Sequence, residues 1–284
     1  MSERKAIPLL RSAVTTLLEH KIIFFPFCVI AFLQLLILEI LYFAPRYPLN
    51  TFFGPLIRRI WSENYLHYPF NLTLLPKFFQ DVQTPVYIFV SSFLIAMAIA
   101  IIVSINNDKK VEMSKIAKES WGAYVHVVIA SIIIFFAVIA MGKVFGLVFN
   151  RALLISAQGG IKFWIKQVIL LGAPTINFLI SIFVATVFAY VLPIIVIDKK
   201  KIHSALLLNF KTLWGSFWFT FLVVLIPSLL YFPILLLRST TSLGDAMPDL
   251  RVLFLVLSIV VMVCIDAIIY CALTTHYLLG KENS

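Results

Sequence analysis

The chain has 284 residues, of which 62% are hydrophobic and only 13% are charged, and its formal net charge is +10. A soluble domain of this length needs far more charged surface, so lipid must be the solvent for most of the chain. Inside a bilayer only helices and closed barrels satisfy the hydrogen-bonding groups of the backbone. The apolar segments are uniform rather than alternating, which excludes a barrel and predicts an all-α membrane protein.

Six apolar segments are long enough to cross a bilayer, which takes about 20 residues. In chain order they are about 22–44, 86–105, 123–149, 174–197, 214–237 and 252–279. The first follows a short basic leader, but it is too long for the apolar part of a signal peptide, and no cleavage site of small residues follows it. We therefore expect a retained anchor and a single polytopic membrane domain with six transmembrane helices.

The basic residues predict the orientation of the chain. An even number of spans places both termini on one side, and the Lys and Arg residues of that side cluster in short segments next to span ends. They are Arg4, Lys5, Arg11, Lys21, Lys109, Lys110, Lys115, Lys118, Lys199, Lys200, Lys201, Lys211 and Lys281. The positive-inside rule then places both termini in the cytoplasm, with the chain in the inner membrane. No nucleic-acid motif accompanies these residues, so we expect them to set topology and to contact anionic headgroups.

Two copies of one sequence join indicate an internal repeat. The joins are Trp121-Gly122-Ala123-Tyr124 and Trp214-Gly215-Ser216-Phe217. Each join closes a Lys-rich amphipathic stretch and opens an apolar run, and each stretch follows an apolar run that ends in Asp-Lys-Lys. This pattern predicts a helix lying in the membrane interface, with its Trp at headgroup depth. The Gly is expected to mark the bend into the membrane, because it permits close approach of the backbone.

The chain then divides into three units of interfacial amphipathic helix plus helical hairpin, at about 1–107, 108–197 and 198–284. In the first unit the stripe is looser, and His20-Lys21 stands where the others have Trp-Gly. The alternative is that the match is a coincidence, since many polytopic proteins carry Lys and Trp at the ends of their spans.

One motif in the last third of the chain is specific enough to compare with known proteins. It consists of Leu192-Pro193-Ile194-Ile195-Val196-Ile197-Asp198, then Ala205-Leu206, then Leu213-Trp214-Gly215-Ser216-Phe217-Trp218. This motif resembles the signature of the membrane domain attached to some glycerophosphodiester phosphodiesterases, and of related uncharacterised bacterial six-span inner-membrane proteins. The resemblance covers mainly residues 190–235, and the sequence has no appended phosphodiesterase domain. Membership would imply an integral membrane helper rather than a hydrolase.

The longest connection, residues 45–85, is aromatic and has helical spacing. Phe53, Ile57 and Trp61 lie on one such stripe, and prolines punctuate the segment. A collar on the outer leaflet fits this composition, and the segment around Trp164 predicts a second such element. The collar either anchors the protein in the membrane or docks another membrane subunit.

Polar residues within the predicted spans suggest an intramembrane site. Asp266 lies near the middle of the sixth span with Tyr270 one turn later, and Asn177 and Ser181 form a similar pair on the fourth. Inserting an ionisable group into the membrane costs about 3 kcal/mol, so such a group is expected to have a polar partner or a functional role. These four residues either bind a proton, a cation or a polar headgroup, or hold the helices together with Asp266 neutral.

A second polar pair lies toward the outer ends of the first and third spans. Glu39 and Lys143 have similar predicted depth and are expected to form an ion pair, unless each extends to the interface. Gly142 and Gly146 beside Lys143 form a small-residue face suited to close helix contact.

The sequence offers no catalytic constellation, metal-ligand spacing or phosphate-binding loop, so no enzyme activity, cofactor or metal is expected. The first hypothesis is a scaffold, accessory subunit or lipid-organising factor that contacts membrane lipids and other membrane subunits. The second is a transporter or permease for a small or lipidic solute that uses the region of Asp266.

Overall fold

The computed structural model of the protein describes residues 6–60, 62–154, 160, 164, 172–239 and 249–282. Every element in this part of the chain is helical. Six segments are long and apolar enough to cross a membrane, which confirms the predicted all-helical fold and number of candidate spans. They are Lys21–Phe43, Phe70–Asn106, Met113–Leu153, Ala173–Asp198, Phe217–Arg238 and Asp249–Lys281.

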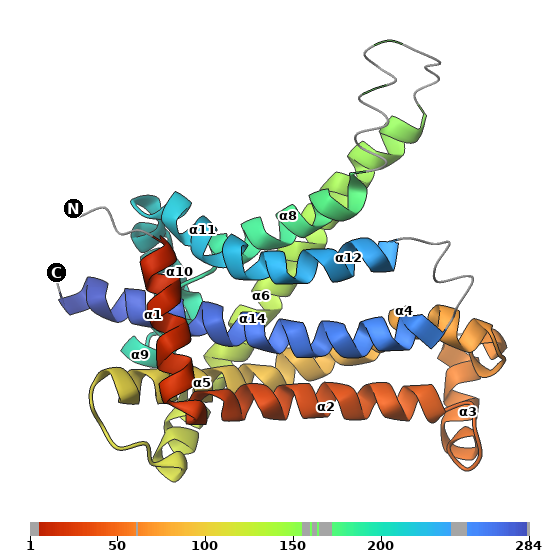
Figure 1. Cartoon of the computed structure of the whole chain (residues 1–284), viewed down its shortest axis with the longest axis horizontal. Coiled ribbons are helices and arrows are strands. Elements are labelled where there is room, and N and C mark those ends of the chain that lie inside the picture. The colour runs from red at the N-terminus through yellow and green to blue at the C-terminus, as the bar shows by residue number, and fades with distance from the viewer. Residues whose placement is uncertain are drawn as a thin grey trace.

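Both chain ends lie at the same end of the bundle (Figure 1), which we call the terminal end. There α1 (Ala6–Glu19) lies crosswise to α2 (Phe24–Phe43) and α14 (Asp249–Glu282), joined to α2 through the short helix η1 (Lys21–Ile23). It buries Leu10 and Leu17 against the bundle and exposes Ile7 and Leu18. This is the arrangement expected of an amphipathic helix at the membrane interface.

The opposite end of the bundle is built from α3 (Leu49–Ile60), η2 (Glu63–Leu66) and the start of α4 (Phe70–Val86). The predicted collar therefore contains a helix, but two residues of the predicted aromatic stripe face the bundle rather than the surface. Phe53 and Ile57 pack inward against α2 and α4, while Phe52 and Leu56 are exposed. Trp61 lies outside the described residues.

The second span begins sixteen residues earlier than the expected start near residue 86. Helix α4 continues through a π turn, η3 (Tyr87–Ser91), into α5 (Ser92–Asn106). Pro85 precedes this turn and cannot donate to the carbonyl one turn before it, which loosens the α-helical hydrogen-bond pattern at this point. The connection predicted at residues 45–85 is thus shorter, because a proline within a helix alters the helix geometry here without ending it.

The third span contradicts the predicted bend at Gly122. Helix α6 (Met113–Leu153) is continuous over 41 residues and passes through Trp121-Gly122 without interruption. Ile116, Ala123 and Val127 form one buried stripe on both sides of the join, packed in the same core as α5. This packing outweighs the cost of a mid-helix glycine, which is at most about 1 kcal/mol.

In the rest of the chain, helices are short and interrupted. The fourth span consists of α8 (Ala173–Val187) and α9 (Val191–Asp198), and α10 (Ile202–Trp214) follows. The fifth consists of α11 (Phe217–Ser228), η4 (Leu229–Tyr231) and α12 (Phe232–Ser239). Here the bend does occur, at Gly215-Ser216. The three units thus differ in helix geometry, and the repeat arrangement stays a prediction.

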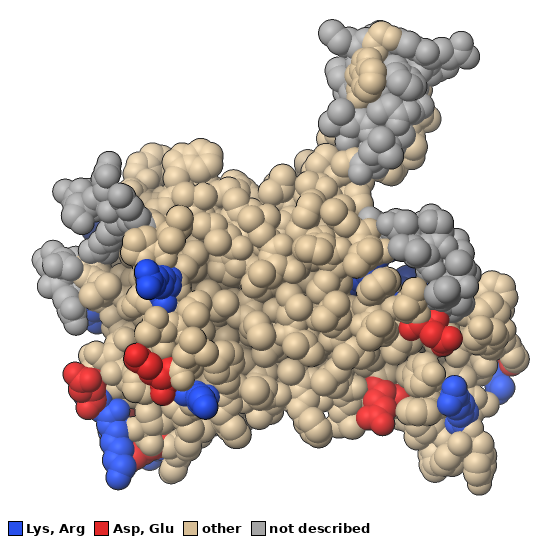
Figure 2. Space-filling view, in the orientation of Figure 1, with Lys and Arg blue, Asp and Glu red and all other residues tan. Residues whose placement is uncertain are grey.

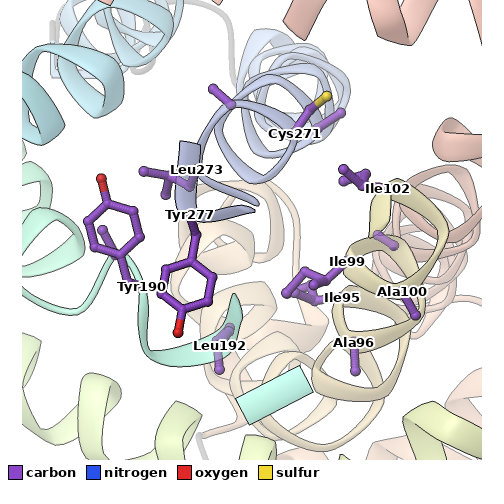
Figure 3. Close-up of a cluster of buried hydrophobic side chains, with 14 of the residues drawn as sticks. Ile95, Ala96, Ile99, Ala100, Ile102, Tyr190, Leu192, Cys271, Leu273 and Tyr277 are labelled. Carbon is purple, nitrogen blue, oxygen red and sulfur yellow. The ribbon is translucent and has the colours of Figure 1, made fainter. Parts of the chain in front are cut away.

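The main core lies between α5, α9 and α14 (Figure 3). Ile99, Ile101 and Ile102 are fully buried, so α5 is an inner helix of the bundle. Tyr190 and Tyr277 enter the same core from the start of α9 and the end of α14, and their rings lie 6.3 Å apart. On the face shown in Figure 2, charged side chains gather toward the two ends and leave an uncharged band between them.

Candidate functional site

The break between α8 and α9 is held by a buried side chain from α10. Pro193 lies in the first turn of α9, where its missing N–H is tolerated, but it would clash within a continuous helix. The backbone groups freed at the break are satisfied by Asn209, which is fully buried. Its Oδ1 accepts from the Tyr190 N–H at 3.0 Å, and its Nδ2 donates to the Val187 carbonyl at 2.8 Å.

The Tyr190 side chain extends this contact to two further helices. Its hydroxyl is hydrogen-bonded to Thr220 Oγ1 of α11 at 3.0 Å and to His276 Nδ1 of α14 at 2.9 Å. The His276 ring also packs on the ring of Phe219, with ring centroids 4.7 Å apart. We call Tyr190, Asn209, Thr220 and His276 the polar cluster. It joins four helices and is enclosed by the bundle.

The end of α9 is tied to the end of α14. Asp198 accepts from the Tyr277 hydroxyl at 2.6 Å and from Lys281 Nζ at 2.8 Å, and Lys200 Nζ lies 4.0 Å away. The Asp198 carboxylate is therefore occupied by α14, and it does not pair with Lys199 in the described structure.

The two Asp-Lys-Lys sequences meet at the terminal end of the bundle. Each follows the end of a core helix, α5 or α9, and each contains a residue in the left-handed conformation, Asp108 and Lys199, both with φ of 52°. The turns bring their lysines to the first turns of α6. We call the surface between them the basic groove, and it is lined by six lysines and two glutamates. These are Lys109, Lys110, Lys115, Lys118, Lys199, Lys200, Glu112 and Glu119.

Two cavities open along the basic groove. The larger, about 480 Å³, lies between α6 and the end of α9, and Gly122, Ala123, His126 and Ile195 form its inner wall. The smaller, about 170 Å³, lies between α5 and α6 and shares Lys115 and Lys199 with it. Within the described structure, His126 Nδ1 is buried and makes no hydrogen bond.

A third cavity, about 360 Å³, lies within the membrane-spanning part. Its polar lining comes from α4, η3, α6 and α14, and its apolar lining includes Ile134 and Leu192. The polar residues are Gln80, Gln83, Thr84, Tyr87, Ser131 and Tyr270. Tyr270 also stacks on Phe27 with ring centroids 6.3 Å apart. Asp266 is partly buried and close enough to interact electrostatically with the hydroxyls of Tyr87 and Tyr270.

The structure divides the intramembrane site that the sequence predicts. Asp266 and Tyr270 are neighbours as expected, but Asn177 and Ser181 are exposed on α8, which packs on α6, α11 and α12. The Ser181 hydroxyl donates to the Asn177 carbonyl at 3.0 Å, within its own helix. Tyr270 instead lines the third cavity together with Tyr87 of the π turn.

The predicted ion pair between Glu39 and Lys143 does not form in the described structure. Both side chains are exposed, and α2 packs mainly against α4, α5 and α14 rather than α6. Gly142 and Gly146 face open space, so no described helix occupies the small-residue face that they form.

The tryptophans predicted as interfacial anchors are exposed where the structure describes them. Trp214 is 92% exposed, and Trp121 and Trp164 are each 68% exposed. Trp121 stacks on Tyr124 with ring centroids 5.3 Å apart. Exposed Trp near a span end is typical of side chains at headgroup depth.

Sequence reasoning missed the polar cluster and the third cavity. Asn209 and His276 were single polar residues in apolar surroundings, and only the interruption at Pro193 indicated that a buried partner was required. Tyr87 lies at the expected start of the second span, and nothing in the sequence there indicated a polar cavity.

No family model, no curated protein and no solved structure matches this chain. The resemblance of residues 190–235 to the membrane domain of glycerophosphodiester phosphodiesterases therefore stays a prediction from the motif. The fold places the chain in the broad class of multi-pass helical membrane proteins.

Proposed function

We propose that this chain is a non-enzymatic inner-membrane protein that organises anionic lipids at its cytoplasmic face and serves other membrane proteins as a scaffold or accessory subunit. The terminal end is then cytoplasmic, in line with the positive-inside rule. The observation that carries this proposal is the basic groove. Its six lysines gather from two distant sequence segments at the end of the bundle where headgroups lie.

The electrostatics of the groove favour anionic lipids. Each lysine near a membrane surface contributes about 1 kcal/mol of attraction to anionic lipid. Among the described residues, Lys200 is the one groove lysine with an ion-pair partner, at 4.0 Å from Asp198. The exposed Trp121 and Trp214 fix the depth of this end in the membrane, which keeps the lysines at headgroup level.

The test is to lift the protein from its membrane into polymer discs and to measure the lipids and proteins that accompany it by mass spectrometry. The expected result is enrichment of anionic lipid over the bulk membrane, which falls when Lys109, Lys110, Lys199 and Lys200 are changed together to Gln. The matched control changes Arg58, Arg59 and Lys77, which lie at the opposite end, to Gln. Equal lipid composition in all three samples would refute the proposal.

Transport of a small or lipidic solute is a second candidate, favoured by the third cavity. A polar-lined cavity within a span, next to a carboxylate and a π turn, has the features of a solute site. Ile134→Trp would fill this cavity, whereas Ile132→Trp on the same helix lies outside its lining. If the cavity binds a solute, we expect the solute to be extracted together with the wild type and with Ile132→Trp, but not with Ile134→Trp. Identical small-molecule content in the three would exclude this function.

A further inference from the structure

We propose that the larger cavity of the basic groove is a specific binding site for one phosphate group, with Gly122 providing its space and His126 and the lysines its contacts. This inference deepens the proposed function, on which it rests, by naming the chemical group and the residues that recognise it. The phosphate belongs either to a phospholipid headgroup or to a soluble phosphate ester, which share the same anionic oxygens.

The space in the cavity exists because of small side chains. Gly122 and Ala123 line the wall on α6, and a Cβ built on Gly122 meets nothing within 4 Å. The helix neither bends at Gly122 nor packs another backbone against it, so the two usual reasons for glycine are absent here. The remaining consequence of glycine at this position is that no side chain enters the cavity from it, and the cavity volume of about 480 Å³ lies in the range of ligand pockets.

The charges around the cavity favour a phosphate. Lys115, Lys118, Lys199 and Lys200 line it against a single acidic residue, Glu119. Lysine binds phosphate as a point charge, and several lysines converging on one cavity match a multiply charged oxyanion. A cationic or neutral ligand has no comparable match in this lining.

His126 supplies a polar group at the inner wall. Its Nδ1 is buried without a hydrogen bond in the described structure, and an unsatisfied polar atom is costly to retain. His126 lines the cavity, so a turn of its ring brings this nitrogen to a phosphate oxygen, to which the imidazole donates in the tautomer or charge state that carries the N–H. The side chain thus lies where a ligand, rather than the fold, completes its contacts.

Lys199 adds an independent indication. Its φ of 52° lies in the left-handed region, where Gly and Asn are the usual residues at a helix end. A lysine retained in this conformation is strained, and strained positions cluster at binding sites. Lys199 is also one of the residues that line both cavities of the groove.

The test uses three full-length proteins in nanodiscs: the wild type, Gly122→Leu and the matched control Gly142→Leu. Both glycines lie on α6, and a Cβ built on either meets nothing within 4 Å, so the two positions are matched in the space next to the backbone. Binding of phosphatidylglycerol is measured by native mass spectrometry in discs that otherwise contain phosphatidylcholine. In a separate arm, binding of glycerol phosphate is measured by ³¹P NMR in phosphatidylcholine discs alone.

The expected result is one retained phosphatidylglycerol per chain in the wild type and in Gly142→Leu, with affinity lowered about tenfold or more in Gly122→Leu and in His126→Ala. If glycerol phosphate binds with the same dependence and phosphatidylglycerol does not, the site is confirmed for a soluble phosphate and the lipid function fails. If Gly122→Leu binds both probes like the wild type, the site is refuted. Should the fourfold Lys→Gln variant then still lose its anionic lipid, the lipid function stands without this site.

Discussion

The two Trp-Gly joins have nearly the same sequence and opposite structures. Trp121-Gly122 lies within the continuous helix α6, whereas Trp214-Gly215 lies at the end of α10, with a turn before α11 begins at Phe217. Neither glycine has a positive φ, and a Cβ at either position meets nothing within 4 Å. The glycine therefore permits a bend at both joins and dictates one at neither.

The difference comes from residues several positions away. The joins are 93 residues apart, and this spacing aligns Asn209 with Ile116 and Thr220 with Val127. Asn209 and Thr220 belong to the polar cluster. Asn209 of α10 bonds to the backbone of Tyr190 and Thr220 of α11 to its hydroxyl, so each helix has its own contact with the break. Ile116 and Val127 are instead buried on one stripe within the main core. Polar contacts to the interrupted span of α8 and α9 favour a bend at the second join. An uninterrupted apolar stripe favours a continuous helix at the first.

The largest expected effect follows from removing the amide that holds the break. Asn209→Leu leaves the Tyr190 N–H and the Val187 carbonyl buried without partners, so we expect a loss of about 2–4 kcal/mol in the free energy of unfolding. Steric trapping in bicelles measures this quantity. Asn177→Leu, at an exposed position on α8, is the control, with an expected change within about 0.5 kcal/mol. Equal stability of the two variants would show that Asn209 does not maintain the bend.

A smaller effect is expected from the hydroxyl at the centre of the polar cluster. Tyr190→Phe removes the hydrogen bonds to Thr220 and His276 and is expected to cost about 1–2 kcal/mol by the same measurement. Combined with Thr220→Val, the losses are expected to be non-additive by about 0.5 kcal/mol or more, since the two side chains share a hydrogen bond. Additive losses would mean that the cluster does not act as a unit, and Tyr68→Phe, exposed at the opposite end, is expected to change nothing.

The smallest effect compares the glycines themselves. Gly122→Ala is expected to stabilise the protein by about 0.5–1 kcal/mol, because alanine is favoured over glycine in a helix interior. Gly215→Ala is expected to change stability little, because Gly215 lies outside the helices and its φ of −90° suits any residue. Similar stabilisation at both positions would contradict the difference between the joins.

The sequence predicted what composition and long apolar runs determine. Six spans, an all-helical fold and a crosswise α1 follow from hydropathy and from the stripe that includes Leu10 and Leu17. The proximity of Asp266 and Tyr270 follows from helical periodicity alone. The neighbours of Tyr270 on other helices could not be predicted, because they depend on how the spans pack and on the π turn at Tyr87.

Other errors have one physical origin. The bend at Gly122 and the site with Asn177 were inferred from residues considered singly, while the structure is determined by what the rest of each helix packs against. Pro193 was the strongest overlooked signal. A proline within a span frees backbone groups that must find a polar partner, and the following amphipathic segment offers Asn209 among its polar residues.

The length of α6 gives the molecule a property that no single site has. At a rise of about 1.5 Å per residue, its 41 residues form a rod of roughly 60 Å, about twice the thickness of the hydrocarbon core. Such a rod tilts to match its surroundings, and a thinner membrane requires a greater tilt. The first turns of α6, which carry Lys115 and Lys118 of the basic groove, can therefore lie among the headgroups while the rest of the same helix crosses the membrane. One helix thus carries both a wall of the groove at the surface and part of the membrane-spanning bundle.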